Sequence, residues 1–201
     1  MMVLDLNPLP GNTPIDLDEL AELIPTISTQ QELNELESKN ITEAHEWAFS
    51  QRRLKVRDPL AEPYVRELHK RMFDQVWKWA GEYRKKEKRP GVLVHQIREE
   101  LPKLLADARL WIDQKTYADY DEVAIRLHHR LVWIHPFPNG NGRHARLLAD
   151  VVAVKLGGTE FSWGSRTLVE AGPARDEYMR CLRLADDNLD NIQPLLKFAR
   201  S

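Results

Sequence analysis

The fold of this chain is decided by the twelve residues His135 to Arg146, which read HPFPNGNGRHAR. The stretch combines one possible proton acceptor, a Gly-Asn-Gly turn and two arginines. A glycine-rich turn that opens a helix presents backbone N–H groups at the positive end of the helix dipole, which makes an anion site. Because arginine pairs with phosphate oxygens in a bidentate way, the stretch favours a polyphosphate ligand beside a base.

Helical patterns flank this stretch on both sides. From Asp121 to Ile134 the apolar residues recur at helical spacing and lead directly to His135. After the glycines a second apolar pattern runs to Leu156 and ends at Gly157-Gly158. The stretch is therefore predicted to join two helices.

The rest of the chain also favours helices, so we predict a mainly α protein. Thr29 and Glu32 have the spacing of a capping box at the start of a helix. The segment from Tyr83 to His95 breaks the helical pattern with Arg89-Pro90-Gly91 and is predicted to form a small β-hairpin or extended flap. The helices expected elsewhere cover 30–50, 63–80, 101–112, 173–185 and 194–199, with a short helical signal at 16–24.

Composition limits the classes of function. The 201 residues suit one domain, with 1–29 as an extended proline-rich arm and 30–201 as the folded domain. Because 31 acidic residues nearly balance 29 basic ones, neither nucleic acid nor a membrane is the expected partner. The single Cys181 excludes a disulfide framework and a multi-cysteine zinc site. No leader pattern or long apolar run stands out, so the expected location is the cytoplasm.

Three interpretations of the glycine-rich turn compete. Gly140 to Ala145 satisfies the Gly-x-Gly-x-x-Gly/Ala dinucleotide fingerprint, and Glu160 lies at the matching distance. That fingerprint needs a preceding β-strand, whereas the residues before it here have helical periodicity, so we reject it. A phosphate P-loop requires Gly-Lys-Ser/Thr, which the chain lacks. A plain helix-breaking turn with solvated arginines explains the density of functional residues less well.

The stretch resembles the signature of the Fic (Fido) proteins, His-x-Phe-x-Asp/Glu-Gly-Asn-Gly-Arg-x-x-Arg, at every position but one. Residues 68–73, 79–84 and 194–198 also resemble segments of that family, so the resemblance covers about 40 to 200. The proline-rich N-terminus and the form His-Pro-Phe-Pro-Asn look most like the bacterial subgroup called mobile mystery protein B. The resemblance implies the Fic fold, a helical bundle with a small β-hairpin flap.

The resemblance also implies an activity, protein adenylylation, in which AMP passes from ATP to a hydroxyl side chain of another protein. His135 would be the general base that takes the proton from a target Ser, Thr or Tyr. Phe137 would anchor the loop. The remaining signature residues, Gly140, Asn141, Gly142, Arg143 and Arg146, would hold the phosphates and stabilise charge at the α-phosphate.

The departure from the signature is Asn139, where the family usually has Asp or Glu. By resemblance that carboxylate helps to hold Mg²⁺, the expected cofactor beside ATP. A neutral amide oxygen supplies less charge, so weak metal recruitment at Asn139 is expected. Two alternatives to AMP transfer therefore remain: a Fic-fold kinase or other nucleotide transferase, and a weakly active nucleotide-binding regulatory module.

Two further expectations concern partners and control. By resemblance the segment from Lys85 to His95 would pin the target peptide by strand addition, with contacts from Lys86, Val92, Leu93 and Val94. Many Fic proteins carry an inhibitory helix with Ser/Thr-x-x-x-Glu-Gly/Asn, whose glutamate pairs with the second signature arginine. Since 30–50 contains no clean copy, we predict that this brake is absent or altered. A toxin-like role with a separate antitoxin-like partner is a further possibility by resemblance.

Overall fold

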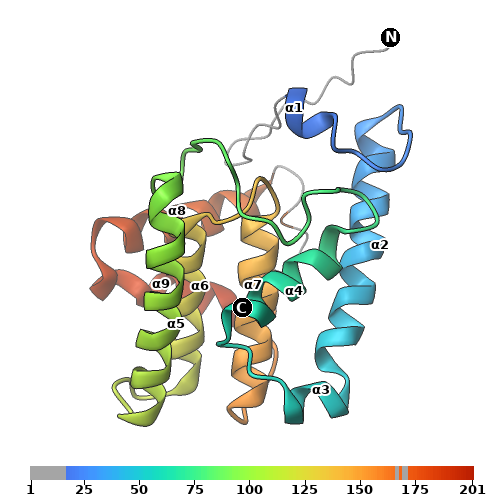
Figure 1. The fold of residues 1–201 in the computed structure, drawn as a ribbon. Coiled ribbons are helices and arrows are strands. Elements are labelled where there is room, and N and C mark those ends of the chain that lie inside the picture. The colour runs from blue at the N-terminus through green and yellow to red at the C-terminus, as the bar shows by residue number, and fades with distance from the viewer. Residues whose placement is uncertain (1–16, 166–167, 169–171) are drawn as a thin grey trace.

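The computed structural model describes residues 17–165, 168 and 172–201, and within them the chain is mainly helical (Figure 1). This confirms the predicted fold class. The helices are α1 (Leu17–Leu20), α2 (Gln30–Phe49), α3 (Gln51–Val56), α4 (Glu62–Phe73), α5 (Ile97–Asp113), α6 (Tyr120–Ile134), α7 (Asn141–Lys155), α8 (Pro173–Asp187) and α9 (Gln193–Ala199), with short 3-10 turns η1 (Val94–Gln96), η2 (Trp163–Ser165) and η3 (Leu189–Ile192).

Helix α2 begins where the capping box predicts. The hydroxyl of Thr29 accepts a hydrogen bond from the backbone N–H of Glu32 at 3.1 Å, and the Glu32 carboxylate accepts one from the N–H of Thr29 at 3.2 Å. The buried stripe of α2 packs on α4 and consists of Leu33, Glu37, Asn40, Ala44 and Ala48. Two polar residues in an otherwise apolar stripe indicate that α2 does more than complete the core.

Helices α6 and α7 form the centre of the molecule. They pack against each other, and their facing residues, which include Leu127, Leu131, Leu148 and Val152, are at most 1% exposed. Helix α6 is capped by Asp119, whose carboxylate accepts from the N–H of Glu122 at 2.8 Å. The predicted helix-loop-helix joint is therefore part of the core.

The predicted helix over 63–80 is too long, because α4 ends at Phe73. Beyond it the backbone pairs with the N-terminal segment: the Ile24 N–H donates to the Val76 carbonyl at 2.9 Å, and the Lys78 N–H donates to the Glu22 carbonyl at 2.9 Å. These long-range bonds, which no local pattern reveals, replace the last turns of the predicted helix.

The predicted β-hairpin in the flap is wrong. Residues 83–93 lead to η1 as bends and irregular backbone, and the β-pairing found among the described residues is the isolated bridge between Leu23 and Trp77. The flap backbone bonds elsewhere: the Arg84 N–H donates to the Pro136 carbonyl at 2.9 Å, and the Val92 N–H donates to the Ile134 carbonyl at 3.4 Å. Since the α6–α7 joint takes these groups, they are not available for a cross-strand ladder.

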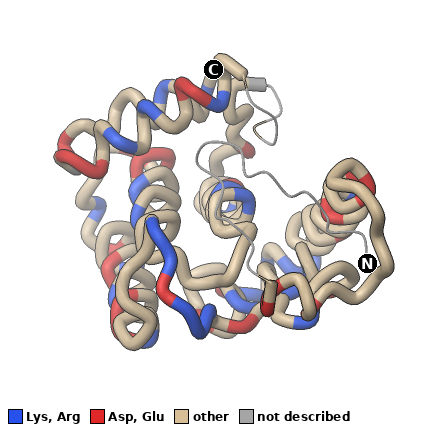
Figure 2. Tube along the Cα trace, turned by 90° about the horizontal axis from the view of Figure 1, so that it is seen from above, with Lys and Arg blue, Asp and Glu red and all other residues tan. Residues whose placement is uncertain are grey.

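Helix α1 lies over the flap, at the top of Figure 1. The extended arm expected over 1–29 stays a prediction, because 1–16 lie outside the described part of the chain. Viewed from above in Figure 2, basic and acidic residues are interspersed along the chain rather than divided between its sides. No helix in 17–165 or 172–201 combines the length and the apolar character needed to cross a bilayer.

Candidate active site

His135 ends helix α6 in a left-handed backbone conformation, with φ 54° and ψ 59°. Residues other than glycine rarely adopt this backbone conformation. It costs about 1–3 kcal/mol and persists only where the surrounding structure imposes it. Here the following Pro136 stops the helix, and the His135 carbonyl accepts a hydrogen bond from Nε of Arg84 at 2.7 Å. The strained residue is thus fixed from both sides.

The imidazole of His135 is set up as a neutral base. Its Nδ1 lies 3.4 Å from the Val132 carbonyl, which can only accept, so Nδ1 carries the proton and the lone pair is on Nε2. Burial lowers the pKa of His135 to about 4, and the nearby charges of Arg84 and Lys88 lower it further, although the bond to Val132 opposes them. The ring is therefore unprotonated near pH 7.

The turn after His135 is held by side chains that sequence reasoning gave other roles. The Asn141 amide accepts from the Phe137 N–H at 2.9 Å and donates to the Phe137 carbonyl at 2.8 Å, which closes the turn on itself. Below it, Nδ1 of His69 accepts from the Gly81 N–H, and Nε2 of His69 donates to the Asn139 carbonyl, each at 3.0 Å. The Asn141 side chain thus holds the turn, and its contact with phosphate stays a prediction.

Gly140 caps helix α7 in the left-handed region, with φ 75°. A Cβ there would lie 2.4 Å from the Phe73 ring, so both the backbone angle and the space require glycine. The first turn of α7 points the N–H groups of Asn141, Gly142 and Arg143 out of the helix without intrahelical acceptors. The first turn of this 15-residue helix has the geometry that the predicted anion site requires.

Arg143 lies at this site but is already paired. Its Nη1 is 2.5 Å from an oxygen of Glu37 on α2, and the other Glu37 oxygen accepts from Nε1 of Trp77 at 2.7 Å. The Glu37 side chain is only 7% exposed and that of Arg143 is 23% exposed. A phosphate that binds Arg143 must therefore compete with a carboxylate.

Glu37 was missed in the sequence analysis, which identified only Glu32 on this helix, as a capping residue. It pairs with the first signature arginine, whereas the resemblance places an inhibitory glutamate on the second. The prediction that the brake is altered remains untested. A visible signal did exist, because Glu37 occupies a buried position in the apolar stripe of α2.

Arg146 and a second missed residue, Arg175, extend the positive charge. The Arg146 guanidinium lies over the Tyr178 ring of α8, 5.3 Å from its centre, and a Cβ on Gly142 would lie 3.7 Å from Arg146 Nη1. Burial lowers the pKa of Arg175, and the charges of Arg146 and Arg143 lower it further. The three guanidinium groups therefore act on one another electrostatically. No motif marks Arg175, because α8 reaches the site only through the tertiary fold.

The residues present do not fit a protein-held magnesium ion. The Asn139 side-chain oxygen accepts from the Gly140 N–H at 2.5 Å, so it turns back into the loop. Among the described residues no group of three or more His, Cys, Asp or Glu side chains gathers at a metal-binding distance. Since Mg²⁺ prefers anionic oxygen ligands, the protein offers it one neutral amide at most.

His144 lies apart from the phosphates, in the core. Its ring is fully buried, and Nε2 is 2.9 Å from the Val65 carbonyl. Burial lowers its pKa to about 4, so it is neutral near pH 7. The ring is part of the core because the turn of α7 that carries His144 packs against α4.

The flap is bound to the active site by Arg84, which is 2% exposed. Besides the His135 carbonyl, its guanidinium donates to the Lys86 carbonyl at 2.9 Å and to the Val92 carbonyl. Both arms of the flap are thereby attached to the residue that carries the base. Of the residues expected to contact a target, Leu93 and Lys86 are exposed, Val94 is half-buried and Val92 is only 5% exposed.

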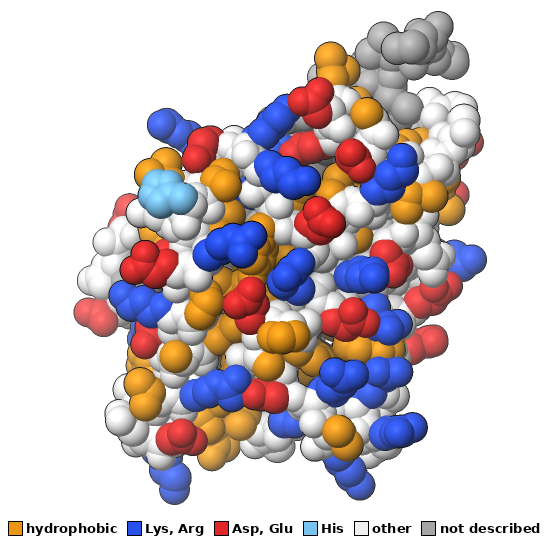
Figure 3. Space-filling view, in the orientation of Figure 1, with side chains coloured by type: hydrophobic (Ala, Val, Ile, Leu, Met, Phe, Trp, Pro, Cys, Tyr) orange, Lys and Arg blue, Asp and Glu red, His pale blue; other side chains and the backbone are white. Residues whose placement is uncertain are grey.

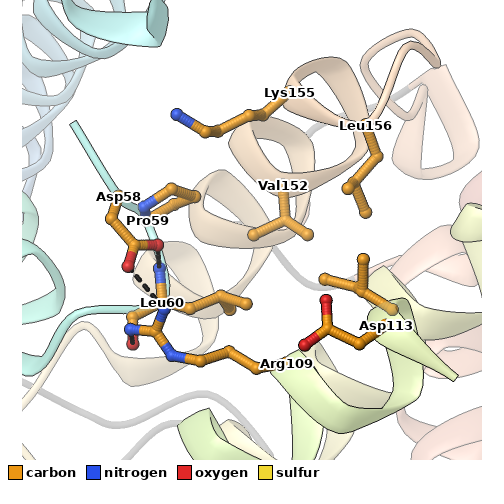
Figure 4. A pocket seen from close by; sticks show the side chains of 9 residues that line it. Asp58, Pro59, Leu60, Arg109, Asp113, Val152, Lys155 and Leu156 are labelled. Carbon is orange, nitrogen blue, oxygen red and sulfur yellow. Dashed lines mark hydrogen bonds and ion pairs between the residues drawn. The ribbon is translucent and has the colours of Figure 1, made fainter. Parts of the chain in front are cut away.

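Two pockets lie away from this site. One, of about 240 Å³, lies at the far end of α7 around Leu60, Val152 and Lys155, where Asp58 and Arg109 pair at 2.6 Å (Figure 4). The other, of about 400 Å³, lies between α2 and α4 around Asn40 and Arg71. Neither pocket is lined by a signature residue, so both lie outside the α6–α7 joint.

Comparison with known sequences agrees with this geometry. Residues 59–153 match the sequence model of the Fic/DOC family. Protein adenylyltransferase fic-1 of Caenorhabditis briggsae is 32% identical over 139 residues, which is 67% of this chain and 25% of that protein. A Fido domain-containing protein of Dictyostelium discoideum is 45% identical over 64 residues, 32% of this chain and 40% of that protein. The chain thus spans a quarter to two fifths of the length of these relatives.

Solved structures share the fold. BepC of Bartonella tribocorum, a VirB-translocated effector protein solved with bound AMPPNP, superposes with a TM-score of 0.67 at 18% identity and covers 92% of this chain and 97% of that one. A Fic domain-containing protein of Bacteroides thetaiotaomicron gives a TM-score of 0.60 at 23% identity, with 82% of this chain and 65% of that one covered. At these identities the similarity concerns the fold alone.

Proposed function

Since this chain belongs to the Fic/DOC family, we propose that it transfers AMP from ATP to a hydroxyl side chain of a protein. The observation that carries the proposal is the α6–α7 joint, in which a neutral, buried base and a helix N-terminus with two arginines are separated by only five residues. A proton acceptor beside an anion site is what a phosphoryl centre needs when a hydroxyl attacks it.

The proposed reaction follows from these positions. Nε2 of His135 takes the proton from a Ser, Thr or Tyr hydroxyl of the target, and the oxygen attacks the α-phosphorus of ATP. The bond from that phosphorus to the α–β bridging oxygen breaks, pyrophosphate leaves, and the target keeps AMP in a phosphodiester. The N–H groups that open α7 stabilise charge at the α-phosphate, while Arg143 and Arg146 bind the outgoing phosphates.

We assign no step to a protein-bound metal. Magnesium would arrive on ATP, held by phosphate oxygens and water, because Asn139 faces back to Gly140. Its chemistry would be to neutralise phosphate charge. The nucleotide also has to displace Glu37 from Arg143, so ATP binding breaks an existing ion pair.

Incubation of the full chain in a host lysate with ATP labelled at the α or the γ position tests the proposal. AMP transfer predicts α-label on a protein band and no γ-label. Label from γ would instead identify the chain as a kinase, and ATP binding without either label would identify it as a regulatory module.

The variant His135→Ala should reduce labelling by about 10²–10⁴-fold while ATP binding persists, since the ring acts in proton transfer. His95→Ala is the matched control, because that ring is exposed on η1. If His135→Ala labels the target as fully as the parent chain does, His135 is not the general base.

A further inference from the structure

Two acidic residues of α1 pair with two lysines of the flap. Nζ of Lys86 lies 2.5 Å from Asp18, and Nζ of Lys88 lies 2.7 Å from Glu19. The first pair is open to solvent, with side chains 51% and 81% exposed, whereas the second is 9% and 11% exposed. Figure 3 shows acidic and basic side chains next to each other on the upper part of this face, where α1 lies.

The backbone after α1 fixes this arrangement. Ile24 and Glu22 bond to Val76 and Lys78, and Leu23 forms a bridge with Trp77. Because this anchor lies within a few residues of α1, Asp18 and Glu19 stay close to the flap at a high effective concentration.

The paired lysines adjoin the base. The Lys88 charge contributes to the lowered pKa of His135. At Gly91, a Cβ would lie 3.3 Å from the Cβ of His135, so the flap backbone contacts the side chain that must receive the target hydroxyl. A segment that pairs with Lys86 and Lys88 therefore lies where a protein substrate has to approach.

We propose that Lys86 and Lys88 form the recognition surface for an acidic segment beside the modified hydroxyl of the target, and that Asp18 and Glu19 occupy this surface in the free chain as an internal competitor. The inference rests on the proposed function and names the class of substrate it takes. When the target binds, its carboxylates take the places of the Asp18 and Glu19 carboxylates beside the two lysines.

The physical balance favours such an exchange. The exposed Lys86–Asp18 pair contributes little, and a helix of four residues has too few internal hydrogen bonds to hold α1 in place on its own. In the less exposed Lys88–Glu19 pair, the carboxylate of Glu19 is exchanged for one of the target. An acidic target segment can therefore replace α1 with little loss, while a neutral or basic segment would leave the less exposed lysine without its counter-charge.

Binding of labelled peptides to the full chain, measured by fluorescence anisotropy without nucleotide, tests the inference. One peptide carries a serine flanked by Asp and Glu, and its partner carries Asn and Gln at those positions. We expect the acidic peptide to bind about tenfold more tightly, with the difference shrinking as salt screens the charges.

Matched variants separate the two parts of the inference. The double variant Asp18→Asn with Glu19→Gln should bind the acidic peptide about three- to tenfold more tightly, since the competitor loses its charge. Lys86→Gln should lower the affinity for that peptide by a similar factor. The controls are Glu22→Gln and Lys103→Gln, which each remove one charge, acidic and basic respectively, at exposed positions outside the recognition surface; both should bind the peptide as the parent chain does.

Equal binding of the two peptides would overturn the recognition surface, and equal binding by the double variant and Glu22→Gln would overturn the internal competitor. The binding assay contains no nucleotide, so its result can be interpreted even if the chain does not transfer AMP. AMP transfer to targets without acidic preference would overturn the inference and leave the proposed function intact.

Discussion

The α6–α7 joint and the flap touch each other but are stabilised in opposite ways. In the joint, Phe137 and Asn141 are at most 3% exposed and are joined by hydrogen bonds between residues only four positions apart. The flap lacks regular secondary structure between 83 and 93, and its lysines are held by charges from a segment almost 70 residues away. The proposed catalytic residue thus lies on a rigid part of the backbone, whereas the proposed recognition surface lies on a segment whose ion pairs can be exchanged.

The largest effect on the joint is expected from Gly140→Ala. The new Cβ meets the Phe73 ring, and the φ of 75° is strained for alanine, so the free energy of unfolding should fall by about 3 kcal/mol. Thermal unfolding measures this. Gly157→Ala, with φ 96° and no atom near its Cβ, is the control for backbone strain alone and should cost only about 1 kcal/mol. Equal losses would show that the Phe73 contact does not matter.

The link between the two regions is broken by Arg84→Lys. One ammonium cannot reach the three carbonyls that the guanidinium spans, so the flap should detach from His135. We expect labelling of the target to fall about 10- to 100-fold while ATP binding changes little, since the loss of one to two hydrogen bonds to a charged group affects the flap only. Arg52→Lys, at an exposed position, is the control. An equal loss of ATP binding would contradict this division.

Stronger Mg²⁺ binding is expected from Asn139→Asp, which places an anionic oxygen next to the phosphates. The Mg²⁺ concentration for half-maximal labelling should fall about tenfold, equivalent to one charge-assisted contact. A titration of Mg²⁺ at fixed ATP measures it. An unchanged Mg²⁺ requirement would show that position 139 does not reach the ion.

A smaller gain is expected from Glu37→Gln. The amide can still accept from Trp77 but no longer neutralises Arg143, so ATP should bind about three- to tenfold more tightly. Calorimetric titration of ATP gives the affinity. Glu46→Gln on the exposed face of α2 is the control, and the same affinity for both variants would mean that Glu37 does not compete with phosphate.

The smallest effect concerns pH. An ordinary histidine with a pKa near ~6.5 would lose about three quarters of its neutral form at pH 6. Because burial lowers the pKa of His135 to about 4, its neutral form is kept as pH falls from 8 to 6 and is lost only near pH 4. Labelling should therefore change less than about twofold between pH 8 and 6. A midpoint near pH 6.5, with circular dichroism showing a folded chain, would contradict this.

The sequence predicted the joint well because its determinants are local. The prolines, the glycines and the apolar spacing on either side lie within one short segment, and they specify where α6 ends and α7 begins. The capping box at Thr29 is local in the same sense. In contrast, the hairpin and the end of α4 were predicted wrongly, since backbone groups there bond to residues that are distant in sequence.

By itself, the sequence determined the helical class, the helix-loop-helix joint and the family signature, all of which depend on residues close together along the chain. Only the tertiary structure decided that Glu37 pairs with Arg143, that Arg175 shares its field, and that α1 covers the flap lysines. Such contacts arise when helices pack, and their partners are set by the three-dimensional path of the chain, which no local pattern encodes.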